Sequence, residues 1–236
     1  MSFLRWFVRT SGAMILAAGA ALAGNWVLAP GTLPLRDIAL EGELQRADRS
    51  QLWSRLEPHS GTNFVRLRLA DVKAGLLADP WVEGVTVRRV WPDRLIVRVK
   101  ERAPVARWGE DSLLDRNGVR FADDNSERSH LPLLQGPAGS EKRLLSTYRS
   151  VQRRLEVLGL RVSALIQDSR RAWRIVLRNG MELEFGRQAF DERLDRFAKA
   201  YPGLLAMRAD AVAAVDLRYS NGFAVRWRRP DGGQPG

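Results

Sequence analysis

Side chains that commonly perform chemistry are scarce in this sequence of 236 residues. It contains no cysteine, which excludes a disulfide scaffold, zinc–thiolate sites, iron–sulfur clusters and cysteine nucleophiles. Its two histidines, His59 and His130, stand apart, so a His-rich metal site is impossible and neither has the neighbours of a catalytic triad. The chain also lacks a glycine-rich phosphate loop, a motif of paired carboxylates and metal-ligand spacing. We therefore predict a non-enzymatic protein without cofactor, metal or small-molecule substrate, whose function is binding.

The formal net charge of +11 comes almost entirely from arginine. The basic residues are scattered from Arg5 to Arg229, and no run of them is longer than two. A nucleic-acid footprint would gather them on one helix or one face. We therefore expect no nucleic-acid binding, and a basic surface that favours acidic partners or an anionic membrane.

The last apolar alternation of the chain, Phe223 to Arg229, predicts a final strand with a free edge. The tail that follows, 230–236, is rich in Gly and Pro and cannot continue a sheet well. A terminal strand with one unpaired side exposes N–H and C=O groups. A segment of a partner protein can pair with these groups and take its specificity from flanking pockets. This edge is therefore the candidate binding site.

An X-Asn-Gly sequence stands between apolar alternations around Asn117, Asn179 and Asn221. A two-residue turn would place apolar residues opposite charged ones, whereas a three-residue loop keeps them on one face. We expect the left-handed conformation at Gly180 and Gly222, which end such loops. In the first copy the only clear apolar pair is Leu113 with Phe121, and in the second the loop pairs Trp173 with Phe185, Ile175 with Leu183, Leu177 with Met181 and Arg174 with Glu184. In the third it pairs Val215 with Trp227, Leu217 with Val225, Tyr219 with Phe223 and Asp216 with Arg226.

Twenty uncharged residues, 10–29, follow a short start that carries Arg5 and Arg9. A helix of this length covers about 30 Å, the thickness of the hydrocarbon core of a membrane. The arginines would keep residues 1–9 in the cytoplasm and place the bulk of the chain outside it. A second interpretation is a cleaved signal peptide, because Ala21-Leu22-Ala23 has the form of a cleavage site. Both interpretations predict export of most of the chain.

Residues 35–102 predict a first exported module. Their apolar spacing indicates a strand, two helices and two further strands, with Asp48 capping the first helix. A three-stranded sheet with both helices on one face would bury these apolar stripes.

Residues 103–229 predict a second module, a mainly antiparallel sheet with two helices. Ser140 could cap the first of these helices and Gly159 end it, while the second should stop before Pro202. The fold class is therefore α+β, and we expect the tail, 230–236, to be disordered.

Several short motifs recur here in a characteristic order. They are Trp91-Pro92 followed by LIVRVKERAP at 95–104, Leu114-Asp115 with Gly118, Leu131-Pro132 with Gly136-Pro137, Arg193-Leu194 with Arg196-Phe197, and VDLRY at 215–219 with Gly222 and Trp227. With them, nearly the whole chain resembles the FtsQ/DivIB family of bacterial cell-division proteins. The resemblance implies a single-pass inner-membrane protein with an uncleaved transmembrane helix at 10–29, a POTRA domain at 35–102 and a β domain at 103–229.

The resemblance also implies a scaffold that links early and late division proteins at the septum. Its β domain would bind the division proteins FtsB and FtsL, and its POTRA domain other division proteins, FtsK among them. Carried over residue by residue, the partner surface falls on Arg218, Tyr219, Ser220, Gly222, Phe223, Ala224, Val225 and Trp227.

Individual residues of this surface have expected roles. Tyr219 and Trp227 are amphipathic anchors of the kind enriched in binding hot spots, although Val225 and Trp227 could equally belong to the core. Arg218 could form a charge-assisted bond with a partner carboxylate. Arg170 and Arg171 would add a basic rim and a salt-sensitive association rate.

Two other classes of function stay open. A POTRA-bearing assembly or chaperone factor would receive extended client strands, but such proteins carry several POTRA repeats or a membrane barrel. An exported enzyme or cell-wall hydrolase is the other class, and the missing catalytic constellation argues against it.

Overall fold

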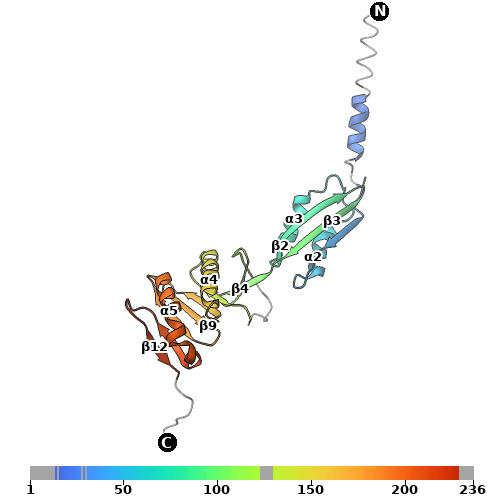
Figure 1. The fold of residues 1–236 in the computed structure, drawn as a ribbon. Coiled ribbons are helices and arrows are strands. Elements are labelled where there is room, and N and C mark those ends of the chain that lie inside the picture. Colours follow the sequence, from blue (N-terminus) through green and yellow to red (C-terminus); the bar gives the residue numbers. More distant parts are fainter. Residues whose placement is uncertain (1–13, 15, 28, 30, 123–129, 229–236) are drawn as a thin grey trace, which may run out of the picture. The chain divides into compact units, whose positions relative to one another are not determined.

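The computed structural model describes residues 14, 16–27, 29, 31–122 and 130–228 (Figure 1). The chain divides into two compact units, Met1–Arg102 and Ala103–Gly236, and each unit has its own hydrophobic core. The predicted cytoplasmic tail, 1–9, and the predicted disordered tail, 230–236, lie outside the described residues.

The first unit begins with a helix over residues 16–27. Among the described residues, no helix has both the length and the apolar character needed to cross a membrane. Part of the transmembrane span predicted for residues 10–29 lies outside them. After the helix the chain is tied to the folded domain by Asn63, whose side-chain amide donates to the carbonyls of Val27, Ala29 and Thr32.

The folded part of the first unit has the predicted order of strand, two helices and two strands, with one short 3₁₀ turn added (Figure 1). Asp48 caps the first helix as predicted, accepting a hydrogen bond from the backbone N–H of Ser50 at 2.8 Å. The elements are β1 (Asp37–Glu41), α2 (Arg49–Leu56), η1 (Glu57–His59), α3 (Leu69–Leu77), β2 (Val82–Val90) and β3 (Arg94–Glu101).

Its three strands have the order β1-β3-β2, with β1 parallel and β2 antiparallel to the central strand. Alternation along β3 turns Leu95, Val97 and Val99 to one face, where they are buried. The core on this face includes side chains of both helices, which confirms that α2 and α3 cover the same side. Their contributions are Leu52 and Leu56 from α2 and Val72 and Leu76 from α3.

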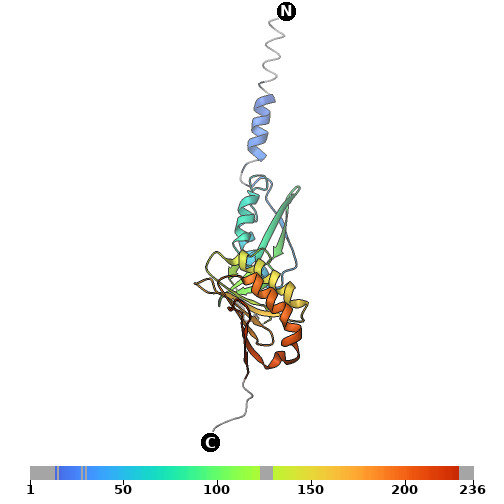
Figure 2. The same ribbon diagram turned by 60° about the vertical axis from the view of Figure 1, so that its left-hand side comes forward.

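The second unit is one sheet of nine strands in the order β12-β11-β10-β9-β8-β7-β4-β5-β6. Its helices α4 and α5 lie on one face of this sheet, where they share a core with the strands (Figure 1 and Figure 2). The elements are β4 (Pro104–Trp108), β5 (Ser112–Asp115), β6 (Arg120–Ala122), β7 (Leu133–Gln135), α4 (Glu141–Glu156), β8 (Val162–Gln167), β9 (Trp173–Leu177), β10 (Glu182–Gly186), α5 (Phe190–Leu204), η2 (Ala206–Ala211), β11 (Val212–Asp216) and β12 (Ala224–Trp227).

The sheet is mainly antiparallel, as predicted, but three of its neighbouring pairs are parallel: β4 with β7, β7 with β8, and β10 with β11. Two of them follow from the helices in the chain. Because α4 connects β7 to β8 and α5 connects β10 to β11, each helix acts as a crossover that returns the chain in the same direction.

The predicted ends of α4 and α5 are only partly confirmed. Gly159 ends α4 in the left-handed conformation, with φ +73°, as predicted. Ser140 stands at the N-cap of α4, but its hydroxyl donates to the carbonyl of Pro137 and caps no helical N–H, so the predicted side-chain cap is wrong. Helix α5 continues through Pro202 to Leu204, because the carbonyl of Tyr201 accepts from Leu205 and closes one further turn.

Candidate partner-binding surface

The final strand, β12, forms one edge of the nine-stranded sheet and pairs, among the described residues, with β11 alone. The backbone N–H of Arg228 donates inward to the carbonyl of Ala211. N–H groups alternate in direction along a strand, so those of Arg226 and Ala224 also face β11. The N–H groups of Val225 and Trp227 therefore point to the free edge.

The predicted pairing of the β9–β10 hairpin is largely confirmed. Ile175 pairs with Leu183 and Arg174 with Glu184, and the N–H of Leu177 donates to the carbonyl of Met181. Gly180 has φ +81°, as expected for the end of a three-residue loop. A register shift after Glu184 places Gly186, instead of Phe185, opposite Trp173, so that one predicted pair is wrong. In the first copy of the motif, Leu113 pairs with Phe121 as predicted.

The predicted register of the last hairpin is wrong by two residues. Val215 pairs with Val225 instead of Trp227, and Asp216 pairs with Ala224 instead of Arg226. The slip is an even number of residues, so the same side chains still face the core. The strands are joined by seven residues, 217–223, and Gly222 lacks the predicted left-handed conformation.

Beyond Asp216 the polar groups of the chain have partners other than β12. The N–H of Leu217 donates to the carbonyl of Glu184 in β10, at 2.8 Å. The carboxylate of Asp216 accepts from the backbone N–H of Arg218 and from its guanidinium, with Nη2 to Oδ2 at 2.7 Å. These bonds hold the pKa of the Asp216 carboxyl below its usual value, the side-chain bond from Arg218 being the main cause. Local side-chain bonds of this kind compete with a regular turn, and here they accompany the longer loop.

Two arginines of α5, which the sequence analysis did not single out as functional, hold the 217–223 loop from the other side. Arg193 donates through Nη2 to the carbonyl of Arg218 at 2.9 Å, and through Nη1 to the carbonyl of Phe185. Arg196 donates through Nη1 to the carbonyls of Tyr219 at 2.8 Å and Gly222 at 3.1 Å. Their spacing of three residues, which places both on one face of a helix, was the available sequence signal.

The predicted partner residues are gathered on this loop and on β12. Tyr219 is 58% exposed and Trp227 is 46% exposed, so both rings are open to a partner. Phe223 and Val225 are partly buried and pack against the core. Ser220 and Ala224 are exposed and Gly222 is half-buried. Arg218 has an exposed guanidinium that is already paired with Asp216.

Arg170 and Arg171 lie in the turn between β8 and β9, which is closed by hydrogen bonds to Asp168. Both side chains are exposed. Strands β10 and β11 are parallel and β9 is antiparallel to β10, so this turn and the 217–223 loop follow the same end of the sheet. Strands β11 and β9 are two positions apart, a separation of about 10 Å. The structure therefore places the predicted residues of the 217–223 loop at the same end of the sheet as Arg170 and Arg171, whereas Trp227, which pairs with Val212 at the start of β11, lies toward the other end of the edge.

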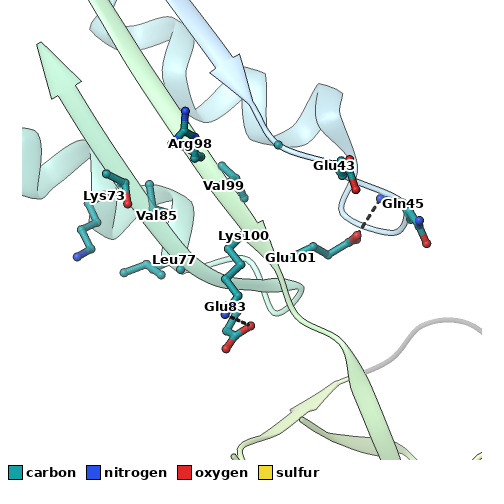
Figure 3. A pocket seen from close by; sticks show the side chains of 13 residues that line it. Glu43, Gln45, Lys73, Leu77, Glu83, Val85, Arg98, Val99, Lys100 and Glu101 are labelled. Carbon is teal, nitrogen blue, oxygen red and sulfur yellow. Dashed lines mark hydrogen bonds and ion pairs between the residues drawn. The ribbon is translucent and has the colours of Figure 1, made fainter. Parts of the chain in front are cut away.

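The first unit carries a hollow of about 850 Å³ beside β2 and β3 (Figure 3). The Glu101 carboxylate closes one side of it by accepting from the backbone N–H groups of Gln45, Arg46 and Ala47, and Lys100 pairs with Glu83 at 3.1 Å. The Glu101 carboxylate is thus occupied by backbone donors, and Glu83 by its ion pair with Lys100. In the described part of the chain, no group of three or more His, Cys, Asp or Glu side chains could hold a metal ion.

Comparison with known proteins agrees with this two-unit architecture. Residues 106–218 match the family model described as "Cell division protein FtsQ/DivIB, C-terminal", and residues 33–102 match the model "POTRA domain, FtsQ-type".

Curated relatives named "Cell division protein FtsQ" are similar along most of the chain. The one from Thioalkalivibrio sp. (strain K90mix) is 37% identical over 228 residues, which cover 92% of this chain and 95% of the relative. The one from Allochromatium vinosum is 39% identical, over 84% of this chain and 79% of the relative. The one from Cellvibrio japonicus is 34% identical over 88% of this chain, and this chain spans 66% of its length.

Proposed function

The chain belongs to the FtsQ/DivIB family of cell-division proteins, and on that basis we propose that it is a non-enzymatic scaffold that binds FtsB and FtsL through the free edge of β12. A partner segment would pair with the outward N–H and C=O groups of β12 and extend the sheet by one strand. The observation that carries this proposal is the position of β12 at the edge of the sheet, with Trp227 exposed on the strand and Tyr219 exposed in the loop before it.

The proposal extends to membrane topology and to the other domain. The uncharged segment 10–29 would anchor the protein in the inner membrane, with residues 1–9 in the cytoplasm and the two folded units in the periplasm at the septum. The POTRA domain, 35–102, would contact further division proteins such as FtsK, while the β domain, 103–229, receives FtsB and FtsL. The basic net charge supports association with anionic lipids and with acidic partner segments.

Strand addition can be tested at Val225, whose N–H faces the free edge. Val225→Pro removes that donor and places a ring where the partner strand must lie. Val225→Ala removes most of the same side chain but keeps the N–H, so the difference between the variants isolates the main-chain contact. One lost hydrogen bond accounts for about 0.5–1.5 kcal/mol, and the displaced strand loses further bonds.

Binding of each full-length variant to the purified FtsB–FtsL pair would be titrated in detergent or nanodiscs. We expect Val225→Pro to bind at least about tenfold more weakly than Val225→Ala, which is about 1.4 kcal/mol. Circular dichroism would check that both variants are folded. Equal affinities of two folded variants would exclude strand addition at this edge.

A further inference from the structure

We infer that Arg196, assisted by Arg193, is a positioning residue for the partner-binding edge: it holds the 217–223 loop in the open shape that presents Tyr219 and starts β12 in register. This inference rests on the proposed function and names residues of α5 that lie outside the predicted partner surface. Seven residues, 217–223, join β11 to β12, where a three-residue loop was expected.

The loop carbonyls meet charged donors on α5. Of the loop's carbonyl groups, those of Arg218, Tyr219 and Gly222 accept from the two guanidinium groups, and Arg196 alone spans the last two with a single nitrogen. A guanidinium is planar and offers five donors in a fixed arrangement, so that it fixes the positions of several acceptors at once. A lysine ammonium is a compact charge on a flexible stem and lacks this geometry.

The helix that carries these arginines is firmly placed. Leu194, Phe197 and Tyr201, on the adjoining face of α5, are buried and belong to the core of the second unit. The approach of Arg193 also depends on a glycine in β10. A Cβ at Gly186 would lie 3.2 Å from its Nη1, and Gly186 has φ +72°. Helix, glycine and arginines together therefore form a rigid support beneath the loop.

The support matters for binding because it acts on the position of the partner-binding groups. Tyr219 is exposed while its carbonyl is held by Arg196, so the ring is free to contact a partner and its backbone is not free to move. Holding a binding element in its bound shape strengthens binding by removing the entropic cost of ordering it. Loss of the support should weaken partner binding even though neither arginine needs to touch the partner.

The test uses the full-length protein with Arg196→Ala, Arg196→Lys and the control Lys199→Ala, an exposed residue of the same helix. Affinity for the purified FtsB–FtsL pair would be measured together with the thermal midpoint of unfolding. We expect Arg196→Ala to weaken binding about tenfold or more, Arg196→Lys to recover only part of that loss, and Lys199→Ala to bind as the wild type does. Full recovery by lysine would overturn the inference, because charge alone would then suffice.

A double-substitution cycle with Tyr219→Ala separates positioning from a general loss of stability. If Arg196 acts through the placement of Tyr219, removing both side chains should weaken binding little more than removing Tyr219 alone. Strictly additive losses would overturn the inference. Unchanged affinity of folded Arg196→Ala, with normal binding by the wild type, would overturn it and leave the proposed function standing. Failure of the wild type to bind FtsB–FtsL would overturn the proposed function and this inference with it.

Discussion

Replacement of Asn63 should separate two tasks that one buried side chain performs. Asn63 is 8% exposed, and its Nδ2 lies 2.8, 3.0 and 2.7 Å from the carbonyl oxygens of Val27, Ala29 and Thr32. Its Oδ1 accepts from the N–H groups of Val65 and Arg66, each at 3.0 Å. The donor half therefore holds the segment that follows the first helix, and the acceptor half shapes the loop before α3.

The magnitude follows from the number of bonds. An amide group has two hydrogens, so the three carbonyls share two donated bonds, and two further bonds are accepted. At about 1 kcal/mol for each net hydrogen bond, Asn63→Ala should lower the free energy of unfolding of the first unit by about 4 kcal/mol. Asn63→Asp keeps the two accepted bonds and loses the two donated ones, and its carboxylate repels the three carbonyls. We expect it to cost at least about 2 kcal/mol.

Amide hydrogen exchange of the full-length protein provides the decisive measurement, because it resolves the two halves. The amides of Val65 and Arg66 should stay protected in Asn63→Asp and exchange faster in Asn63→Ala. Urea unfolding monitored through the same amides would give the energies. Equal protection of these two amides in both variants, or a loss below about 1 kcal/mol in Asn63→Ala, would refute the reasoning.

Two further predictions concern the second unit. Gly180→Ala should lower the free energy of unfolding by about 1–2 kcal/mol, because Gly180 has φ +81° and a Cβ there would lie 2.9 Å from Nη2 of Arg228. Gly222 has no positive φ, and a Cβ there would meet nothing within 4 Å, so Gly222→Ala should change the free energy of unfolding by less than about 1 kcal/mol. Urea unfolding measures both. Burial raises the pKa of Tyr201, so its contribution to stability is complete below the unfolded pKa of about 10 and is lost as the pH rises through the higher folded value. Tyr201→Phe should therefore lose less stability than the wild type between pH 9 and 12 when the thermal midpoint is followed, and parallel losses would contradict this assignment.

The sequence predicted the structure correctly where its pattern of apolar residues was compatible with only one arrangement. The second of the two helices predicted within residues 35–102 is present as α3 (Leu69–Leu77), because its apolar spacing leaves one buried face and Pro80 follows its end. The pairing of Ile175 with Leu183 was predictable for a similar reason, since an odd slip would turn the apolar residues to solvent. The edge position of β12 was predicted because the tail that follows, 230–236, is rich in Gly and Pro and such a sequence continues a sheet poorly.

The sequence was insufficient where long-range partners decide the outcome. A slip of two residues between β11 and β12 preserves the facing of every side chain, so the hydrophobic pattern could not exclude it. The donors that select the observed register, Arg193 and Arg196, come from a helix some twenty residues earlier in the chain. Two of the three parallel pairs were missed because pairing across a helix leaves no local turn signal in the sequence.

Several arginines near the free edge of β12 bond to the protein itself. Arg193, Arg196 and Arg228 donate to backbone carbonyls, and Arg218 is held by Asp216. These hydrogen bonds organise the main chain, and Asp216 also neutralises the charge of Arg218. We expect binding at β12 to depend chiefly on main-chain pairing and on the rings of Tyr219 and Trp227, and Arg170 and Arg171, exposed in a neighbouring turn, to add to the electrostatic steering of a partner. Arginine thus fixes the backbone next to β12, and in the β8–β9 turn it promotes association with a partner.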